Sequence, residues 1–286
     1  MKILGTGLSG LVGSRVVELL TPDFSFENLS LETGVDITDK GSVDGYFSKS
    51  DAPWVFHMAA YTDVQGAEKD KDAAWNVNVL ATEHIAQNCR KLGKKLLYID
   101  TDYAFDGKKK TYTEKDTPHP LGWYAKTKTE GAKRVLGLGD KGLVIRISNP
   151  YRAHPVGKKD WVHKMLERLQ EGQSISGTTD QLFAPTFIDD IAVSLRALVK
   201  AQAHGIYHVV SAPALSPYHA ALTVAEVFSF DKKLVTQTTF AEMFFNRAPV
   251  PQYAALKNDK IQSLGVEMHA FSEGVAEVKK QELTIL

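Results

Sequence analysis

The chain has 286 residues, of which 43% are hydrophobic and 24% are charged. This composition is typical of a globular protein, and the length fits one large α/β domain or a main domain with a smaller lobe. The 34 basic residues balance the 34 acidic residues, so the charge indicates no nucleic acid and no anionic membrane surface as a partner. Because no run of about 18 apolar residues is present, we expect no membrane span.

Cysteine content and the first residues bear on the compartment. Cys89 is the single cysteine, so the chain has no intramolecular disulfide and no cysteine-based metal cluster. The first residues, Met1–Gly5, run into a glycine-rich turn and lack the apolar core of a signal peptide. Low cysteine content is typical of a reducing compartment. Together these features predict a cytoplasmic protein.

The N-terminal glycines form a pattern typical of a dinucleotide site. Lys2–Thr6 is a short apolar run that predicts a buried first strand, and Leu11–Leu20 has the apolar pattern of a helix. Glycines between them allow the backbone to approach a pyrophosphate, which then lies at the N–H-rich start of the helix. Two overlapping templates, G-x-G-x-x-G and G-x-x-G-x-x-G, are formed by Gly5, Gly7, Gly10 and Gly13.

The second strand is predicted at Phe24–Leu31, and a dinucleotide fold normally ends this strand with an acid that binds the adenosine ribose. Glu32 is the nearest acid and Glu27 is the alternative. No Lys or Arg occurs between positions 21 and 39, so nothing there suits a 2′-phosphate, which favours NADH over NADPH. Arg15, a basic residue on the first helix, leaves NADPH as an alternative cofactor.

Small side chains end the next predicted strand, Trp54–Ala60. Ala59 and Ala60 leave room for a flat cofactor, and ordinary packing explains them equally well. Asn78 lies inside the helical pattern Ala73–Leu92, where it is either exposed or bridges toward the active site. Further strands are predicted at Lys95–Asp100 and Leu143–Ile147, with a helix at Lys40–Phe47.

A threonine and a tyrosine–lysine pair are the candidate catalytic residues. Thr101 follows a central strand, at the edge where α/β sheets bind ligands, and its hydroxyl suits a substrate carbonyl; turn capping is the alternative. Tyr124 and Lys128 are four residues apart, so in a helix they share a face. A nearby ammonium favours the ionised phenol and suits the pair to proton transfer. The alternative is a surface tyrosine beside a solvated lysine.

The alternation of strands and helices weakens after residue 148, although Gly205–Val210 is predicted to return to the sheet as a strand. We therefore predict an α/β fold, a Rossmann-like doubly wound parallel sheet with a smaller, discontinuous C-terminal substrate lobe. The dinucleotide-binding domain is predicted at 1–148 plus about 187–213, and the lobe at about 149–186 plus 214–286. The later helices are predicted at Trp161–Leu169, from Phe187, and at Leu222–Phe228, Phe240–Phe245, Lys257–Leu264 and Phe271–Gln281.

These motifs together resemble those of the extended short-chain dehydrogenases/reductases, and more narrowly those of the dTDP-4-dehydrorhamnose reductases. The family pattern Ser-Thr-Asp-Tyr-Val-Phe-Asp-Gly is present in altered form at Asp100–Gly107, and the pattern Tyr-Gly-Lys-Thr-Lys is present at Tyr124–Lys128. Shorter matches extend the resemblance over nearly the whole chain, at Ala59–Thr62, Ala67–Glu68, Ala184–Thr186, Gly205–His208 and Arg247.

The resemblance implies hydride transfer from NAD(H) or NADP(H) to C4 of a nucleotide-linked 4-ketosugar, with dTDP-4-dehydro-L-rhamnose favoured as substrate and dTDP-L-rhamnose as product. It implies that Tyr124 protonates the new alkoxide, that Lys128 lowers the pKa of this tyrosine and holds the nicotinamide ribose, and that Thr101 binds the keto oxygen. The candidate cofactor-binding residues are Gly7, Gly10, Leu11, Val12, Glu32, Asp36, Ile37, Ala59, Ala60, Tyr61, Tyr124 and Lys128. The candidate substrate-binding residues are Thr101, Asp102, Tyr103, Asn149 and Arg247.

Four positions depart from the family pattern. Asp100 replaces a serine, His57 an asparagine, Asn149 a tryptophan that lines the sugar site, and Phe183 a glycine. The catalytic residues therefore match the family pattern, whereas positions that face the sugar depart from it. Two alternatives remain: a sugar-nucleotide epimerase or dehydratase that retains its NAD, and a non-catalytic regulatory subunit similar to the beta subunit of methionine adenosyltransferase.

A metal ion and a second subunit are left open by the sequence. Some relatives in the family use Mg²⁺ at a dimer contact, but no carboxylate cluster here is assigned to it, so no metal ligand is predicted. A homodimer is compatible with the resemblance. The predicted partner is a small-molecule nucleotide sugar, with no nucleic acid and no membrane.

Overall fold

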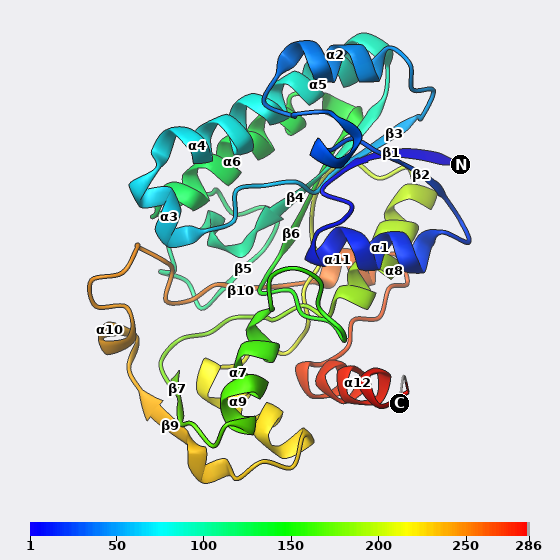
Figure 1. The fold of residues 1–286 in the computed structure, drawn as a ribbon. Helices are drawn as coiled ribbons and strands as arrows, with labels where there is room; N and C mark the ends of the chain where they lie inside the picture. The colour runs from blue at the N-terminus through cyan, green and yellow to red at the C-terminus, as the bar shows by residue number, and fades with distance from the viewer. Residues whose placement is uncertain (285–286) are drawn as a thin grey trace.

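The computed structural model describes residues 1–284 and is built around a six-stranded parallel sheet (Figure 1). The strand order is β2-β1-β3-β4-β6-β8, and every neighbouring pair is parallel. The chain therefore starts inside the sheet and winds outward in both directions, which confirms the predicted fold class. The strands are β1 Lys2–Thr6, β2 Ser25–Asn28, β3 Trp54–His57, β4 Lys95–Thr101, β6 Gly142–Ile147 and β8 Gly205–His208.

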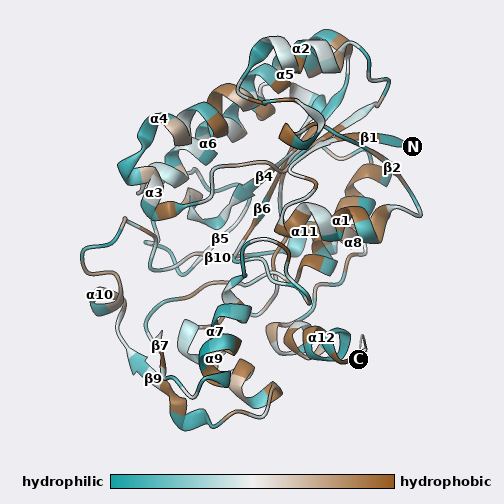
Figure 2. Cartoon of the chain, in the orientation of Figure 1, coloured by the Kyte–Doolittle hydropathy of each residue, from teal (hydrophilic) through white to brown (hydrophobic). Residues whose placement is uncertain are grey.

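Helices cover both faces of the sheet because its strands are apolar on both sides. In β3, Trp54 and Phe56 lie in one core and Val55 lies in the other, as the two-residue period of a strand requires. Figure 2 shows hydrophobic and hydrophilic residues mixed along the outer helices, which is typical of helices that bury one face. The first core packs against α1 Leu11–Leu20, α8 Ile188–Lys200 and α11 Asp259–Gln262, and the second against α2 Lys40–Phe47, α5 Ala81–Leu92 and α6 Trp123–Leu136.

A separate apolar core joins the elements in the lower part of Figure 1. Its two-stranded sheet pairs Ile175 with Val235 in parallel register. We propose that these elements form the substrate lobe, and the separate core supports the predicted division, except that α11, within the predicted range 214–286, packs against the first core instead. No helix within residues 1–284 has the length and apolarity needed to cross a bilayer. The elements of this core are α7 Trp161–Gln170, β7 Ile175–Thr178, α9 Pro217–Val227, β9 Val235–Thr238 and α12 Phe271–Leu283, and the short helix α10 Phe240–Met243 follows β9.

The helix predicted at Ala73–Leu92 is interrupted in the structure. A π-helical turn spans Asn76–Leu80 and separates α4 Lys71–Trp75 from α5. The apolar spacing continues through the turn, so the sequence pattern could not reveal it. Short elements without a strong period were also not predicted, namely α3 Val64–Lys69, β7, β9, and the paired strands β5 Thr111–Tyr112 and β10 Ala255–Leu256.

A histidine joins α7 to the C-terminal helix α12. His163 Nδ1 lies 3.0 Å from Asp160 Oδ1, and its Nε2 lies 2.6 Å from Glu282 Oε1. Burial lowers the pKa of His163, but the hydrogen bonds to Asp160 and Glu282 outweigh burial and raise it to about 9. Because the folded pKa lies above the ordinary value, the stabilisation is complete at acidic pH and is lost as pH rises through about 9.

We therefore expect the melting temperature of the wild type to fall between neutral pH and pH 9, and to fall less in His163→Gln. The measurement is thermal unfolding of both proteins across this range. His119→Gln, which changes an exposed histidine in a loop, is the matched control and should follow the wild type. Identical pH dependence in the wild type and His163→Gln would contradict the assignment.

Candidate active site

The sheet order creates a topological switch point between β1 and β3, where the chain changes its winding direction. Ligands of doubly wound sheets bind outside the carboxyl ends of the strands at such a point. The glycine turn follows β1, Ala59–Tyr61 follows β3, and Thr101 ends β4. The topology therefore brings these three predicted segments to one edge of the sheet.

Thr101 lies where β4 ends and a short 3₁₀ turn begins. Its Oγ1 accepts a hydrogen bond from Tyr103 N at 3.2 Å and donates to Asp102 Oδ1 at 3.1 Å. Asp102 is also held by Ser148, whose hydroxyl donates to Oδ2 at 2.6 Å. Burial raises the pKa of Asp102 to about 7, against the opposing effect of these hydrogen bonds. Thr101 therefore caps the turn, as the alternative interpretation predicted. Its hydroxyl also contacts Asp102, an acid whose pKa lies near neutral pH.

The helix that carries Tyr124 and Lys128 begins against a distant carboxylate. Glu68 Oε1 accepts a hydrogen bond from Trp123 N at 2.6 Å, and so satisfies a free N–H in the first turn of α6. A side chain at Gly122 would meet Pro249 O at 2.6 Å, so glycine is needed for this close entry. These contacts fix where the first turn of α6 lies relative to α3 and to the loop at Pro249.

Tyr124 is half-buried, and Thr101 is among the groups that act on its phenol. Burial raises the pKa of Tyr124, the charges of Asp100 and Asp102 raise it further, and Thr101 opposes them. This direction is opposite to the predicted lowering by Lys128. The phenol is therefore protonated at neutral pH, as a proton donor must be.

Lys128 lies one turn after Tyr124 and is only 3% exposed. Burial lowers the pKa of its ammonium to about 8, while Asp100 opposes the shift. The ammonium lies 4.0 Å from the centre of the Tyr98 ring, where the ring face stabilises a cation. Lys128 is thus buried and Tyr124 is half-buried, so the alternative of a surface tyrosine with a solvated lysine is wrong.

Asn78, in the π-helical turn, links this helix to the segment after β3. Its Oδ1 accepts from Tyr61 N at 2.9 Å, and its Nδ2 donates to Tyr61 O at 3.0 Å and to Thr127 Oγ1 at 3.0 Å. Thr127 in turn donates to Tyr124 O. The bridge predicted for Asn78 is therefore present, and the π turn explains how a helical residue reaches inward.

His57 ends β3 and connects the first strand to α5. Its Nδ1 lies 2.7 Å from Thr6 Oγ1, and its Nε2 lies 2.9 Å from Thr82 Oγ1. Burial lowers the pKa of His57 to about 3, helped by the charge of Lys128. A neutral imidazole thus fixes Thr6, which accepts from Ala59 N at 3.2 Å, and aligns the two strand ends that flank the glycine turn.

The glycine turn has the close contacts that a pyrophosphate cradle needs. Gly7 has φ +66°, and a side chain there would meet Ala59 N at 2.6 Å. Gly10 precedes α1 in extended conformation, and no side chain among residues 1–284 caps the helix start. The N–H groups of the first turn, including those of Leu11 and Val12, are therefore suited to an anion. The residues fit the phosphates of a dinucleotide.

The two acids predicted to bind the adenosine ribose, Glu27 and Glu32, have different hydrogen-bond partners. Glu27 is bound by Ser50 and Lys2, whereas Glu32 accepts from Asn28 at the end of β2. Arg15 forms a two-pronged contact with Asp189, with both distances at 2.7 Å, so it lies in an ion pair on α1 and α8. Asp36 is exposed and binds Thr38 within its own turn, and the neighbouring Ile37 is half-buried.

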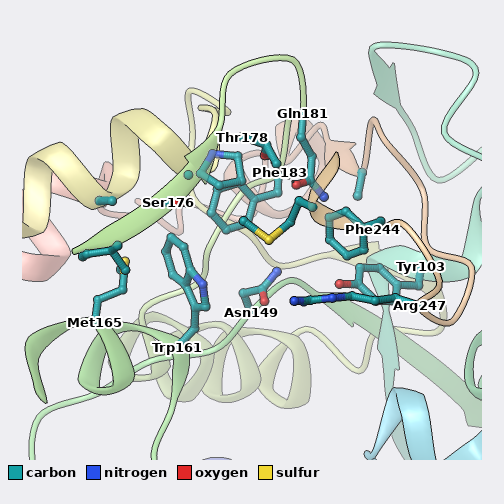
Figure 3. A pocket seen from close by; sticks show the side chains of 16 residues that line it. Tyr103, Asn149, Trp161, Met165, Ser176, Thr178, Gln181, Phe183, Phe244 and Arg247 are labelled. Carbon is teal, nitrogen blue, oxygen red and sulfur yellow. Dashed lines mark hydrogen bonds between the residues drawn. The ribbon is translucent and has the colours of Figure 1, made fainter. Parts of the chain in front are cut away.

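A cavity of about 280 Å³ adjoins the catalytic residues through Tyr103 (Figure 3). The Tyr103 ring meets the Tyr124 ring edge-on at 6.5 Å. Asn149 and Arg247, two other predicted substrate residues, also line the cavity. Figure 3 shows Tyr103, Arg247 and Phe244 together at one end of the cavity, with Trp161 and Met165 at the opposite end. The sequence analysis did not identify most of the cavity lining, which includes Trp161, Met165, Thr178, Gln181, Met243 and Phe244.

These missed residues come from segments far apart in the chain, and only the fold brings them together. Trp161 packs edge-on against Phe183 with their ring centres 5.1 Å apart. The aromatic residues near 161 and 244 are the signal available in the sequence, but a helix and a loop with such residues are equally typical of a core. Among residues 1–284 no group of three metal-ligating side chains is close enough to hold an ion.

Comparison with known proteins assigns the family. The family model described as "RmlD substrate binding domain" matches residues 1–284. The chain belongs to this family. A dTDP-4-dehydrorhamnose reductase of Aggregatibacter actinomycetemcomitans is 32% identical over 232 residues, 78% of each chain. The methionine adenosyltransferase 2 subunit beta of Danio rerio is 28% identical over 283 residues, covering 94% of this chain and 86% of the relative.

A solved structure supports the same assignment. The dTDP-4-dehydrorhamnose reductase of Bacillus anthracis, in complex with NADP, has a TM-score of 0.90 and 27% identity, covering 98% of this chain and 99% of its own. The predicted resemblance to the extended short-chain reductases is therefore confirmed.

Within the RmlD family, the four departures have identifiable contacts in this chain. Asp100 forms a buried ion pair with Arg146, and His57 joins Thr6 to Thr82. Asn149 has φ +38°, and it lines the cavity together with Phe183. Two departures thus lie beneath the catalytic residues and two reshape the cavity.

Proposed function

We propose that this protein uses NADH or NADPH to reduce a nucleotide-linked 4-ketosugar, and that the substrate is dTDP-4-dehydro-L-rhamnose, giving dTDP-L-rhamnose. The observation that carries the proposal is the meeting of Thr101, Tyr124 and Lys128 at the switch point of the sheet, between the glycine turn and an aromatic cavity. The names of the reductase relatives support the substrate.

The bound cofactor would supply the hydride to C4 of the sugar. Tyr124, protonated because burial raises its pKa, donates its proton to the oxygen that becomes negative. The buried ammonium of Lys128 stabilises the same developing charge. Thr101 and Lys128 are buried, and electrostatic stabilisation is stronger in such surroundings than in water.

Asp102 controls the direction of the Thr101 hydroxyl in this proposal. As a carboxylate it accepts the Thr101 hydrogen, whereas as an acid it donates to Thr101 Oγ1. Its pKa of about 7 makes both forms accessible at neutral pH. The protonated form frees the Thr101 hydrogen for the keto oxygen of the substrate.

The cavity supports a nucleotide as the remainder of the substrate. Trp161, Phe183 and Phe244 offer flat apolar surface to a base. The Arg247 guanidinium at the same cavity suits a diphosphate, because arginine binds phosphate oxygens in pairs. Asn149 and Tyr103 then lie on the sugar side.

The test is turnover by the purified chain. With dTDP-4-dehydro-L-rhamnose, we expect oxidation of NADH or NADPH and the appearance of dTDP-L-rhamnose in equal amounts. The same assay with dTDP-glucose, which has no keto group at C4, is the control and should show no oxidation. Binding of the cofactor without reduction of any 4-ketosugar would contradict the proposal.

The two alternatives have less support. A dehydratase commonly places an acidic pair after the strand-end threonine, but here Tyr103 follows Asp102. The regulatory-subunit alternative has the Danio rerio relative in its favour, yet Tyr124 and Lys128 are both present, and Lys128 is buried. Reduction to dTDP-L-rhamnose would exclude both.

We propose that the reaction takes place in the cytoplasm. A homodimer stays a prediction.

The single cysteine has no role in the proposed reaction. Cys89 is fully buried, and burial raises the pKa of its thiol to about 12, so the thiol is poorly suited to redox chemistry. Mg²⁺ has no assigned ligands in the proposal.

A further inference from the structure

The end of β2 lies beside the glycine turn. Asn28 is the last residue of β2 and pairs in register with Gly5 of β1. In a doubly wound dinucleotide fold, the side chain at the end of this strand meets the adenosine ribose. Asn28 Oδ1 is buried, and within residues 1–284 it has no hydrogen-bond partner. A buried acceptor without a donor is costly, so a small rotation of the Asn28 side chain that brings this oxygen to a ribose hydroxyl is favoured.

Glu32 adds a carboxylate to this position. Asn28 Nδ2 donates to Glu32 Oε2 at 3.3 Å. The turn between them is held by Thr33, whose hydroxyl contacts Asn28 O at 3.0 Å and Ser30 O at 2.9 Å. Glu32 is therefore placed by its backbone and by Asn28, with its side chain open to solvent beside the orphaned oxygen.

The nearby cations are engaged elsewhere. Lys2 contacts Glu27 and Asp51, and Lys40 lies 2.5 Å from Asp44. Arg15, the residue that kept NADPH open, is bound by Asp189 and Glu18. No Lys or Arg occurs between positions 21 and 39. A 2′-phosphate at this place would thus face a carboxylate, and these three basic side chains are already paired.

We propose that Asn28 and Glu32 select a dinucleotide with a free adenosine 2′-hydroxyl, so that this chain prefers NADH to NADPH. The inference rests on the proposed function only in taking a nicotinamide dinucleotide as the cofactor. The ribose hydroxyl donates to the orphaned Asn28 oxygen or to Glu32. A phosphate monoester, with a charge of roughly −1.5 to −2 at neutral pH, is repelled by Glu32.

The experiment is direct binding, measured by calorimetric titration of the purified chain with NADH and with NADPH and without sugar substrate. We expect NADH to bind about tenfold more tightly at low salt, and the ratio to shrink at high salt because screening weakens the repulsion. Glu32→Gln should bind NADPH more tightly than the wild type does and so reduce the ratio. Glu27→Gln, which removes an acid that faces Lys2, is the matched control and should keep the wild-type ratio.

Three other results of these titrations would each contradict a different part of the proposal. Equal or tighter binding of NADPH by the wild type overturns the preference and leaves the proposed reductase intact. An equal change for both cofactors in Glu32→Gln overturns the role of Glu32. Failure of both cofactors to bind overturns the proposed function and this inference with it.

Discussion

Replacement of Tyr124 by phenylalanine should lower kcat by roughly 10²- to 10⁴-fold, the usual contribution of a positioned general acid. The phenol is half-buried and protonated, and Thr101 acts on its pKa, so its loss removes the proton donor and leaves the ring in place. The measurement is steady-state reduction of dTDP-4-dehydro-L-rhamnose. KM and the Kd for NADH should change little, because the hydroxyl acts mainly on the oxygen that becomes negative.

A second tyrosine serves as the control for this substitution. Tyr46 lies in α2 and packs against the core on that side of the sheet, and its hydroxyl is far from the switch point in sequence and in fold. Tyr46→Phe should keep the wild-type kcat. If Tyr124→Phe kept more than half of the wild-type kcat, a different proton donor would be required, and Asp102 would be the next residue to replace.

The central sheet could be predicted from the sequence because its strands are continuous apolar runs separated by helices with a clear period. The glycine turn and the Tyr124–Lys128 spacing were equally visible, since each depends on residues close together in the chain. The return of Gly205–His208 to the sheet also followed from a local apolar run.

Other features depend on contacts between distant segments, which a linear pattern does not contain. Glu68 meets the start of α6 across 55 positions, and the cavity wall combines residues from α7, β7 and the loop near Arg247. The pKa of Tyr124 was predicted in the wrong direction for the same reason. Spacing alone shows a neighbouring lysine, whereas burial and two carboxylates decide the direction in the fold.

The ion pair beneath the active site should dominate stability. Arg146 Nε lies 3.0 Å from Asp100 Oδ2, and both side chains are almost fully buried, at 1% and 0% exposure. The two residues are direct neighbours in β6 and β4. Arg146→Met should lower the free energy of unfolding by about 3–5 kcal/mol, because it leaves a buried carboxylate without its partner. The measurement is urea unfolding at neutral pH.

The double variant Asp100→Ser/Arg146→Met separates the stranded charge from the loss of packing. It should recover most of the lost stability, because replacing both ions is far less costly than removing one. A double variant as unstable as Arg146→Met would show that packing of the guanidinium, which lies 4.9 Å from the Phe105 ring centre, matters more than its charge.

Asp100 raises the pKa of Lys128 and of Tyr124. Its removal in the double variant should therefore move the alkaline limb of the pH–rate profile to lower pH, and an unmoved limb would show that Asp100 serves the fold alone.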